Sequence, residues 1–586
     1  MPGQVVINNV VKDVIGKQAP ACTLVFDVGT QSVRAAAVCN NRIVAIEQHG
    51  IALRHGERGS GRVEQDARQV RDALFACLYK ISKVYVFTRA ALVCQRSSVL
   101  AWQRDSLQPR SPILSWMDTR AAGSLEQLSA DQLSQLKQRS GLWPNAHCAA
   151  LKLAFLQQSV LQENLLQENL LQENLEQEGL LQQSLLQQGL LQKRHRAAGD
   201  DILSPFCFGP LACWLQSLLT DKHQDFFCDE SHAARSLLWN RSEANWDVEL
   251  AAIFNVSLAP LPKPLPVLRK WGRIKNTVSS NVDVKHAAST ATTKAPVNNI
   301  RPTNKAPELS VVIGDQNAAF FALQQILPES LQRDSALLNL GTGAFILKAL
   351  TTTQKAHKRL LQTLIVSDKV RRYEAEEACI NGCGSALARW LELSGAYDSQ
   401  RDLICDVDDT QGEGELDYCC LNQCGGLASP WWQVERGEPL RFFNLRGAEL
   451  PCQCPSAELR FRAQALLESI VFMLLCNTNL MQLQRLYLSG GLARSRFLTD
   501  RLCVLSGLKI YLLTQTELSV SGGAALAGET LTAEALKPKR LRPALHKQCL
   551  QKQCLQKAAI NVPALKRRFA CWRALMRREL GASCEL

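Results

Sequence analysis

The chain has 586 residues, 46% of them hydrophobic, with 22 cysteines and a formal net charge of +13. This length predicts two or more domains and is ample for large hydrophobic cores. Because there is no run of about 20 apolar residues and the N-terminus lacks the pattern of a secretory signal, we expect a cytoplasmic protein. Its cysteines should then be reduced thiols, since disulfides rarely persist in that compartment.

The positive charge is concentrated at the C-terminus. Residues 536–586 contain 13 Lys or Arg and two Glu, so the body of the chain is nearly neutral and gives no clear sign of a nucleic-acid or membrane partner. The apolar residues of this tail recur at helical spacing, at Leu565, Phe569, Trp572, Leu575 or Met576, and Leu580. Such a basic amphipathic helix could contact RNA, an anionic membrane or a protein partner, or it could dock on its own chain.

The first predicted element is a β-hairpin over residues 23–38, "TLVFDVGTQSVRAAAV", in which two apolar and β-branched runs flank a glycine-containing turn. Asp27 stands where the first run ends and the turn begins. A buried carboxylate without a partner is costly or changes its protonation, so we expect Asp27 to meet a cation, a donor or water.

Two segments are predicted to be insertions. Residues 160–194 run through seven five-residue units such as "LLQEN". Each five-residue step turns the leucines by about 140° around an α-helix, so they form no single stripe. A solvated helical extension is favoured over a pentapeptide-repeat β-helix, whose inward positions want small residues. Residues 275–309 are rich in Thr, Ser, Asn, Ala, Lys and Pro and predict a flexible insertion or linker.

Residues 311–326, "VVIGDQNAAFFALQQI", predict a short strand followed by a helix. Asp315 stands at the junction, where its side chain would point into a cleft. On the residues alone, it could be a helix N-terminal acid that accepts from backbone donors, or a carboxylate with a chemical role.

Residues 336–350, "ALLNLGTGAFILKAL", repeat the pattern of the first hairpin around Gly341 and Thr342. Two such hairpins indicate two halves of related construction that face one ligand. The chain has neither a Walker motif nor a strand followed by GxGxxG, whereas a phosphate clamp of glycine, Thr hydroxyl and turn N–H groups fits. The partner of Asp27 would then be a hydrated Mg²⁺ that arrives with a nucleotide, although Asp and Gly are also ordinary turn residues.

The densest group of cysteines follows, at Cys419, Cys420, Cys424, Cys452 and Cys454. Four thiolates could bind zinc. The spacing is not a paired CxxC pattern, however, so scattered core or surface cysteines are favoured.

Two glycine pairs lie further along, in "LYLSGGLARSRFLTDRL" (486–502) and "SVSGGAALAG" (519–528). In the first, an apolar strand leads through Gly490 and Gly491 into a predicted helix. Glycines in these places would let a flat base or ribose lie against the backbone, although a glycine pair after a strand is often only a tight turn.

The ordered set of segments resembles the FGGY carbohydrate kinases, the family of glycerol kinase and xylulokinase. The matching pieces span roughly residues 22–530 and read "FDVGTQSVR", "GRVEQDARQV", "VCQRSSVLAWQRDSLQPRSPILSWMDTRA", "DESHAARSLLWNRSEANWDVEL", "VVIGDQNAAFFAL", "NLGTGAFIL", "GGLASPWW" and "YLSGGLARSRFL". The resemblance implies an α/β actin-like ATPase fold, of the ribonuclease H-like kind, with two lobes and an interlobe cleft. It implies a sugar-side lobe at 22–274 that carries the repeat insertion, a linker at 275–309, a nucleotide-side lobe at 310–535 and the basic tail at 536–586.

The resemblance also implies roles at the sugar. In the similar kinases the Asp of GDQ is the general base that accepts the proton of a sugar hydroxyl, which makes Asp315 the catalytic residue here. Gln316 would bind a second hydroxyl. The remaining substrate-binding positions carried over are Arg96, Ser97, Trp116 and His147. Arg96 could donate to hydroxyls, and Trp116 would form an apolar wall unless it is only a core aromatic.

ATP and Mg²⁺ are the implied cofactors. Asp27 would hold the metal environment, Thr30 and Thr342 the phosphates, and Gly490 and Gly491 the adenosine. The other cofactor-binding positions are the turn residues Gly29, Gln31, Ser32 and Gly341.

The sequence departs from glycerol kinases in several places. They carry Arg-Glu where this chain has Arg96-Ser97, and a Tyr at the position aligned with His147, so a larger polyol or a ketose is expected rather than glycerol. The family signature is also altered in "QALLES" (464–469). Two other classes stay open, a chaperone-type actin-like ATPase and a sugar-binding regulator without turnover. The sequence leaves the oligomeric state, including a homodimer, undecided.

Overall fold

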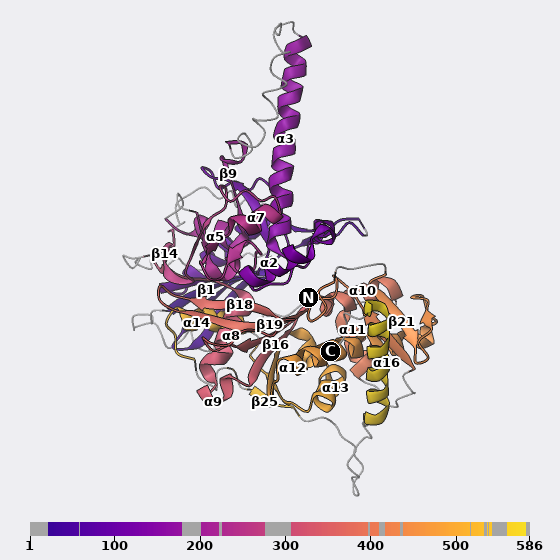
Figure 1. Cartoon of the computed structure of the whole chain (residues 1–586). Helices are drawn as coiled ribbons and strands as arrows, with labels where there is room; N and C mark the ends of the chain where they lie inside the picture. Colours follow the sequence, from indigo (N-terminus) through magenta and orange to yellow (C-terminus); the bar gives the residue numbers. More distant parts are fainter. Residues whose placement is uncertain are drawn as a thin grey trace, which may run out of the picture.

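The computed structural model describes residues 22–57, 59–177, 201–221, 226–275, 306–395, 399–408, 417–433, 438–515, 517–531, 536, 538–541 and 560–581. Two adjoining lobes are each built around a mixed β-sheet, and the long helix α3 (Ala149–Gln177) projects from the N-terminal lobe (Figure 1). The first part of the repeat segment 160–194 is therefore helical, as expected. Residues 178–194 of that segment and 276–305 of the predicted linker lie outside the described residues.

The N-terminal lobe contains a six-stranded sheet in the order β14–β15–β6–β1–β2–β3. Its strands are β1 (Cys22–Val28), β2 (Ser32–Cys39), β3 (Arg42–Gly50), β6 (Phe87–Cys94), β14 (Leu268–Arg273) and β15 (Glu308–Gly314). β1 and β2 are antiparallel and form the predicted hairpin, whereas β15 and β1 both run parallel to β6. β15 joins this sheet, so the predicted start of the second lobe at residue 310 falls within a strand of the first sheet.

The C-terminal lobe contains a seven-stranded sheet in the order β18–β19–β17–β16–β23–β24–β25. Its strands are β16 (Ser335–Leu340), β17 (Ala344–Ala349), β18 (Leu361–Ser367), β19 (Arg372–Ile380), β23 (Arg485–Ser489), β24 (Lys509–Leu513) and β25 (Pro538–Arg540). β16 and β17 form the second predicted hairpin. β23 runs parallel to β16 and leads through Gly490 into the short helix η4 (Gly491–Arg494) and then α13 (Arg496–Ser506).

Helices α8 (Asp315–Ile326) and α14 (Leu518–Leu526) pack against each other and share a hydrophobic core with both sheets. A Cβ atom at Gly522 would overlap the carbonyl oxygen of Ala318 on α8, and one at Gly523 would lie 2.7 Å from a methyl carbon of Val93. The second glycine pair therefore serves close packing of helices and sheet. The expectation that it faces a base or ribose is wrong, because both glycines are buried inside α14.

A smaller sheet completes the N-terminal lobe. It has the order β4–β5–β8–β7–β9, with β4 (Leu53–His55), β5 (Val63–Gln65), β7 (Val99–Gln103), β8 (Ile113–Leu114) and β9 (Phe206–Pro210). The chain segments that follow β6 and β8 carry Arg96 and Trp116. The N-terminal part of α3 packs on this sheet through apolar residues such as Leu153 and Leu156, which anchors the projecting helix.

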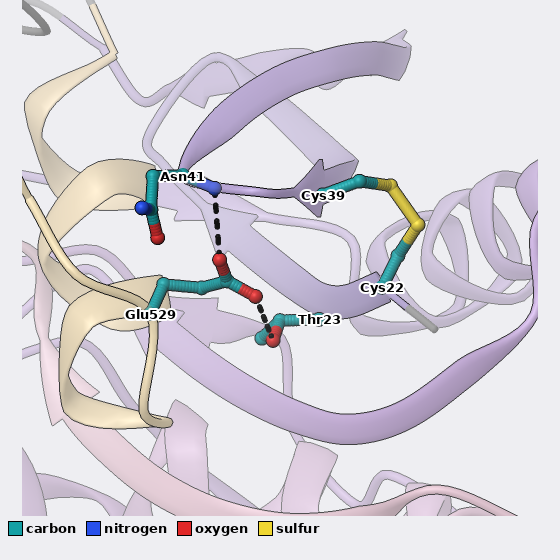
Figure 2. The surroundings of a disulfide bond; sticks show 5 residues. All are labelled: Cys22, Thr23, Cys39, Asn41 and Glu529. Carbon is teal, nitrogen blue, oxygen red and sulfur yellow. Dashed lines mark hydrogen bonds between the residues drawn. A yellow bond between two sulfur atoms is a disulfide. The ribbon is translucent and has the colours of Figure 1, made fainter. Parts of the chain in front are cut away.

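The free end of the first hairpin is closed by a disulfide between Cys22 and Cys39 (Figure 2). The two residues extend the antiparallel pairing of β1 and β2 by one position beyond Thr23 and Val38, so their Cα atoms are only 4.5 Å apart. The Glu529 carboxylate accepts from the Thr23 hydroxyl and the Asn41 backbone beside this bond. The expectation that all cysteines are reduced is thus wrong for this pair, because the argument from compartment took no account of strand pairing.

The C-terminal tail forms helix α16 (Val562–Leu580), which docks on α12 (Leu459–Leu480) and on β20 (Tyr418–Asn422). Its buried residues are Leu565, Arg568, Trp572, Leu575 and Met576. Arg568 donates two hydrogen bonds of 2.7 Å to Glu468, and the Trp572 indole donates to the Cys420 carbonyl at 3.1 Å. Of the alternatives for this amphipathic helix, docking on its own chain accounts for the apolar face.

The cysteine group between residues 419 and 454 belongs to the core of this lobe. Cys419, Cys420 and Cys424 are buried, and Cys452 and Cys454 are partly buried. Among the described residues, no three His, Cys, Asp or Glu side chains are placed to hold a metal ion together.

No helix within the same ranges is long and apolar enough to cross a membrane.

Candidate functional site

A cavity of about 140 Å³, the central cavity, lies where the two lobes meet. The N-terminal lobe and α8 contribute Thr30, Gln95, Arg96, Ser97, Trp116, Asn145, His147, Cys148, Arg235, Asp315 and Gln316 to its lining. The C-terminal lobe contributes Asn339, Gly341, Thr342, Gly343, Phe345, Cys379 and Asn381. Segments more than 300 residues apart in the chain therefore form one small cavity that many polar side chains line.

Asp315 reaches this cavity because β15 ends at Gly314 and α8 begins at the next residue. Its carboxylate accepts from the Gln316 backbone N–H at 2.8 Å and has a longer contact of 3.4 Å with the Gln316 side-chain amide. Burial raises the pKa of Asp315 above its ordinary value of 3.8, and the nearby Arg96 guanidinium opposes that shift. Such a carboxyl group can accept a proton at neutral pH more readily than an exposed one.

The two Gly-Thr turns approach the cavity from opposite lobes. Gly29 N–H donates to the Ser32 carbonyl at 2.9 Å, and Gly341 N–H donates to the Gly343 carbonyl at 3.0 Å. Each turn is therefore closed by a bond from its first glycine, although the second turn is one residue shorter. Thr30 accepts a 3.0 Å hydrogen bond from the Trp116 indole. Glycine and hydroxyl groups that converge in this way are typical of sites that bind phosphate oxygens.

A larger hollow of about 910 Å³, the outer cleft, adjoins the central cavity at Gly341 and Thr342. It is also lined by Gln31 and Gly491, and by residues of α10 (Gly384–Ser394) and α11 (Gln400–Asp408). Gly490 has φ +93°, and a Cβ there would overlap the Leu340 carbonyl oxygen, so only glycine fits this turn. The outer cleft is large enough for a nucleotide whose phosphates reach the Gly-Thr turns.

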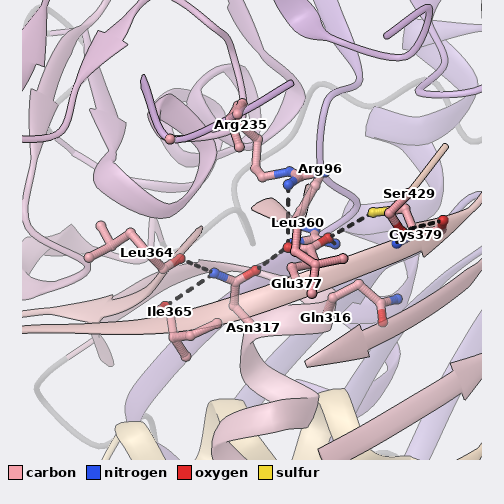
Figure 3. A network of polar contacts seen from close by, with 12 residues as sticks. Arg96, Arg235, Gln316, Asn317, Leu360, Leu364, Ile365, Glu377, Cys379 and Ser429 are labelled. Carbon is pink, nitrogen blue, oxygen red and sulfur yellow. Dashed lines mark hydrogen bonds and ion pairs between the residues drawn. The ribbon is translucent and has the colours of Figure 1, made fainter. Parts of the chain in front are cut away.

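Arg96 lines the central cavity, but its guanidinium group is bound by an acid from the other lobe (Figure 3). Its two terminal nitrogens donate to the Glu377 carboxylate at 2.9 and 3.0 Å, and one also donates to Asn317 at 3.3 Å. The opposing charges of Arg235 and Arg96 hold the pKa of Glu377 below its usual value despite its complete burial. This ion pair joins the segment after β6 to β19.

Trp116 and His147 form an aromatic corner of the cavity. The indole ring lies 5.6 Å from the imidazole and 6.1 Å from the ring of Phe345, measured between centroids. His147 Nδ1 lies 2.9 Å from the Trp116 carbonyl oxygen, which can only accept, so Nδ1 carries the proton. Burial lowers the pKa of His147 to about 4, so the imidazole is neutral near pH 7 and its Nε2 is an acceptor.

Comparisons with known proteins agree with this geometry. Residues 22–174 match the family described as "FGGY family of carbohydrate kinases, N-terminal domain". Apulose kinase of Pectobacterium atrosepticum is 24% identical over 513 residues, which cover 86% of this chain and 89% of that protein. Glycerol kinase of Alcanivorax borkumensis is 24% identical over 518 residues, with 86% and 88% covered. The chain is thus similar to FGGY carbohydrate kinases along most of its length, and the family model matches its N-terminal part. Members of this family are phosphotransferases with alcohol acceptors.

The fold agrees with the FGGY family as well. The crystal structure of Plasmodium falciparum glycerol kinase with ADP superposes with a TM-score of 0.63 at 19% identity, and the match covers 87% of this chain and 90% of that one. This similarity shows the two-lobed, actin-like ATPase fold that the sequence predicts.

The structure brings most of the predicted site residues to the two hollows. Asp315, Gln316, Arg96, Ser97, Trp116, His147, Thr30, Gly341 and Thr342 line the central cavity, and Gln31 and Gly491 line the outer cleft. Four predicted cofactor positions, namely Asp27, Gly29, Ser32 and Gly490, stand outside the lining of both hollows in the described chain. Gly29, Ser32 and Gly490 instead form the backbone of the turns.

Several lining residues escaped the sequence reasoning. Arg235, Asn339 and Phe345 lie inside segments that the family resemblance had already marked, so a reading of every polar or aromatic position in those segments could have found them. Asn381 and Cys379 had no such signal. They reach the cavity because β19 pairs with β17 and ends beside it.

Asp27 lies in a surrounding that fits a divalent cation. Burial raises its pKa to about 6; Arg34 and the Ser519 hydroxyl lower it, and the carboxylates of Asp315 and Glu517 raise it. Ser519 donates to Asp27 at 3.1 Å, and the Arg34 guanidinium is 3.6 Å away. A buried carboxylate with a second carboxylate nearby can take part in a Mg²⁺ site, in which water and phosphate oxygens complete the shell.

Proposed function

We propose that this chain acts as an FGGY-type carbohydrate kinase, which transfers the γ-phosphoryl group of ATP to a hydroxyl of a sugar or polyol. The observation that carries the proposal is the convergence of Asp315 and both Gly-Thr turns on one cavity between the lobes. The outer cleft would hold the adenosine, the turns at Thr30 and Thr342 the phosphates, and the central cavity the acceptor. The adjoining position of the two hollows supports this order.

Asp315 would act as the general base. An alcohol is a poor nucleophile, and a carboxylate at hydrogen-bond distance both orients the hydroxyl toward the γ-phosphorus and accepts its proton. Gln316 is held by Asn339, whose amide donates to its side-chain oxygen at 2.9 Å, and this leaves the Gln316 amide nitrogen for a second substrate hydroxyl. Most of the acceleration would come from positioning of the reactants in an enclosed site.

Mg²⁺, with Asp27 in its environment, would neutralise charge on the phosphates. Thr342 and the backbone N–H groups of the turns would add donors at the same oxygens. The enclosed central cavity would keep water from competing with the sugar hydroxyl for the phosphoryl group.

We further propose a polyol or ketose larger than glycerol as the acceptor. Ser97 lines the cavity where glycerol kinases carry a Glu, so a carboxylate anchor for a small triol is missing and space is gained. Trp116 and Phe345 offer apolar faces for carbon atoms, and the neutral His147 offers an acceptor for a hydroxyl.

We propose that the protein acts in the cytoplasm, where ATP is supplied. Most cysteines in the described ranges, such as Cys77, Cys94 and Cys207, form no disulfide, which supports a reducing compartment. The oligomeric state, including a homodimer, stays a prediction.

The test is sugar-dependent ADP release with MgATP and a panel of polyols, pentuloses and hexuloses. Asp315→Asn should abolish sugar-dependent turnover and leave ATP affinity close to that of the wild type, because the substitution removes the base and keeps the shape. Asp131→Asn is a matched control, since Asp131 is also in the first turn of a helix, α2 (Ala130–Ser140), but is exposed. Equal turnover in Asp315→Asn and wild type would remove Asp315 from the mechanism, and ATP hydrolysis unaffected by any sugar would favour a chaperone-type ATPase.

A further inference from the structure

Glu377 forms ion pairs with two arginines of the other lobe beside the central cavity (Figure 3). It lies in β19 of the C-terminal sheet, and its side chain is completely buried. Arg96 binds it through both terminal nitrogens, at 2.9 and 3.0 Å, and Arg235 donates to the same carboxylate at 3.3 Å. The two arginines line the cavity in front of Glu377, which itself is not part of the lining.

The geometry of Arg96 is further fixed by Asn317 on α8. The Asn317 oxygen accepts from Arg96 at 3.3 Å, while its amide nitrogen donates to the carbonyl groups of Leu364 and Ile365 on β18 at 2.6 and 3.2 Å. These bonds set the orientation of the Asn317 side chain, so its oxygen faces the guanidinium. Each terminal nitrogen of Arg96 thus has an acceptor that is itself held in place.

Without these acceptors, Arg96 would be close to a different acid. Its aliphatic stem crosses directly over Gly314, where a Cβ atom would lie 2.7 Å from the Arg96 Cγ. The next residue is Asp315, whose carboxylate forms no ion pair in the described part of the chain. Two unpaired charges of opposite sign that are buried this close together are expected to pair, because each lacks solvation.

We propose that Glu377 is a positioning residue, which holds the Arg96 guanidinium away from Asp315 so that the Asp315 carboxylate stays free to accept a proton. This inference rests on the proposed role of Asp315 as the base. An Arg–carboxylate pair at Asp315 would occupy the oxygens that must face the substrate hydroxyl. It would also favour the ionised acid and so weaken it as a base.

A purely structural role is the competing explanation, in which Glu377 only neutralises two buried cations. The two explanations differ in what happens at Asp315 when Glu377 loses its charge. The other titratable or charged groups near Asp315 are Arg96, His232 of α6 (Glu230–Ala233), Asp27 of β1 and Cys94 of β6, and none of these needs to be altered in the test.

The experiment compares Glu377→Gln with Glu374→Gln. Glu374 is on the same strand and accepts from Arg241 at 3.0 and 3.2 Å, but Arg241 is outside the lining of the central cavity, so the control breaks a similar pair at a different place. Crystal structures and pH profiles of sugar-dependent kcat/KM are measured for both variants and the wild type. Glu377→Asp, whose carboxylate is drawn back by one methylene, serves as the conservative variant and as the test protein if Glu377→Gln does not fold.

In the structure of Glu377→Gln we expect Arg96 within hydrogen-bond distance of Asp315. We also expect kcat to fall about 100-fold, and the acid limb of the pH profile of kcat/KM to move by about one pH unit toward lower pH. Glu377→Asp should show the same changes to a smaller degree, and Glu374→Gln should show none. Arg96 in its wild-type place in both Glu377 variants, or acid limbs equal to that of Glu374→Gln, would overturn the inference. Failure of the proposed function is seen separately, as a wild type without sugar-dependent turnover, since the position of Arg96 is read from the crystal structures.

Discussion

The packing of α14 on α8 leads to a prediction in which two opposing effects can be weighed. Gly522→Ala places a methyl group in the middle of α14, where helix propensity alone would stabilise the protein by about 1 kcal/mol. That methyl group would overlap the backbone carbonyl of Ala318, which cannot rotate away as a flexible side chain could. Overpacking in a filled core costs about 1–3 kcal/mol or more, so the steric effect should exceed the propensity gain.

Because the Ala318 carbonyl is rigid backbone, the steric cost should lie at the upper end of that range or above it. We therefore expect Gly522→Ala to lower the free energy of unfolding by about 2 kcal/mol or more. Because the overlap pushes on the helix that begins with Asp315, sugar-dependent ADP release should also fall. Urea unfolding and the ADP assay are compared for the wild type, Gly522→Ala and Gly123→Ala. Gly123 lies in the helical turn η2 (Ala122–Gln127) with no atom within 4 Å of an added Cβ. A variant as stable and as active as the wild type would refute the packing argument.

Three further predictions concern Asp315, the C-terminal helix α16 and His147. Since burial raises the pKa of Asp315, kcat/KM for the sugar should fall as the pH drops through that raised pKa. If kcat/KM falls only at or below pH 3.8, the ordinary pKa of an Asp, this prediction is wrong. Trp572→Ala should lower the free energy of unfolding in urea by about 3–5 kcal/mol, because the indole is 1% exposed and packs on Phe472 and Trp431. Lys566→Ala, on the exposed face of the same helix, should leave the stability unchanged. Equal stability of the two variants would contradict a structural role for the tail. His147→Phe should raise KM for the sugar by about 10-fold, because one hydrogen bond is lost, and it should leave KM for ATP unchanged. An unaltered KM for the sugar would show that His147 does not bind the substrate.

Local patterns predicted the parts of the chain that carry the Gly-Thr turns. The alternation of apolar residues and the glycine turns identified both hairpins, and the strand-to-helix junction identified the place of Asp315. These features succeed because a turn and the start of a helix are encoded by neighbouring residues.

Features that depend on pairing between distant segments were missed. The segment "YEAEEA" has three acids in β19, and nothing local shows that Glu377, rather than Glu374 or Glu376, meets Arg96. The glycine pair in α14 was assigned to a nucleotide, because its contact with Ala318 exists only after two helices some 200 residues apart have packed. Strand pairing likewise brought Cys22 beside Cys39.

The carboxylates of Asp27 and Asp315 are kept available for a ligand in a similar way. Arg34 on β2 is 3.6 Å from Asp27, yet it forms its closest ion pair with Glu517, at the start of α14. Arg96 crosses over the residue before Asp315, yet it binds Glu377. In both cases an acid from the C-terminal half of the chain takes the charge of an arginine from the N-terminal half. Because Glu517 shares Arg34 and Glu377 binds Arg96, Asp27 and Asp315 both keep carboxylate oxygens that a ligand can use. Stability alone would not require these oxygens to stay available, so the arrangement is that of a binding site.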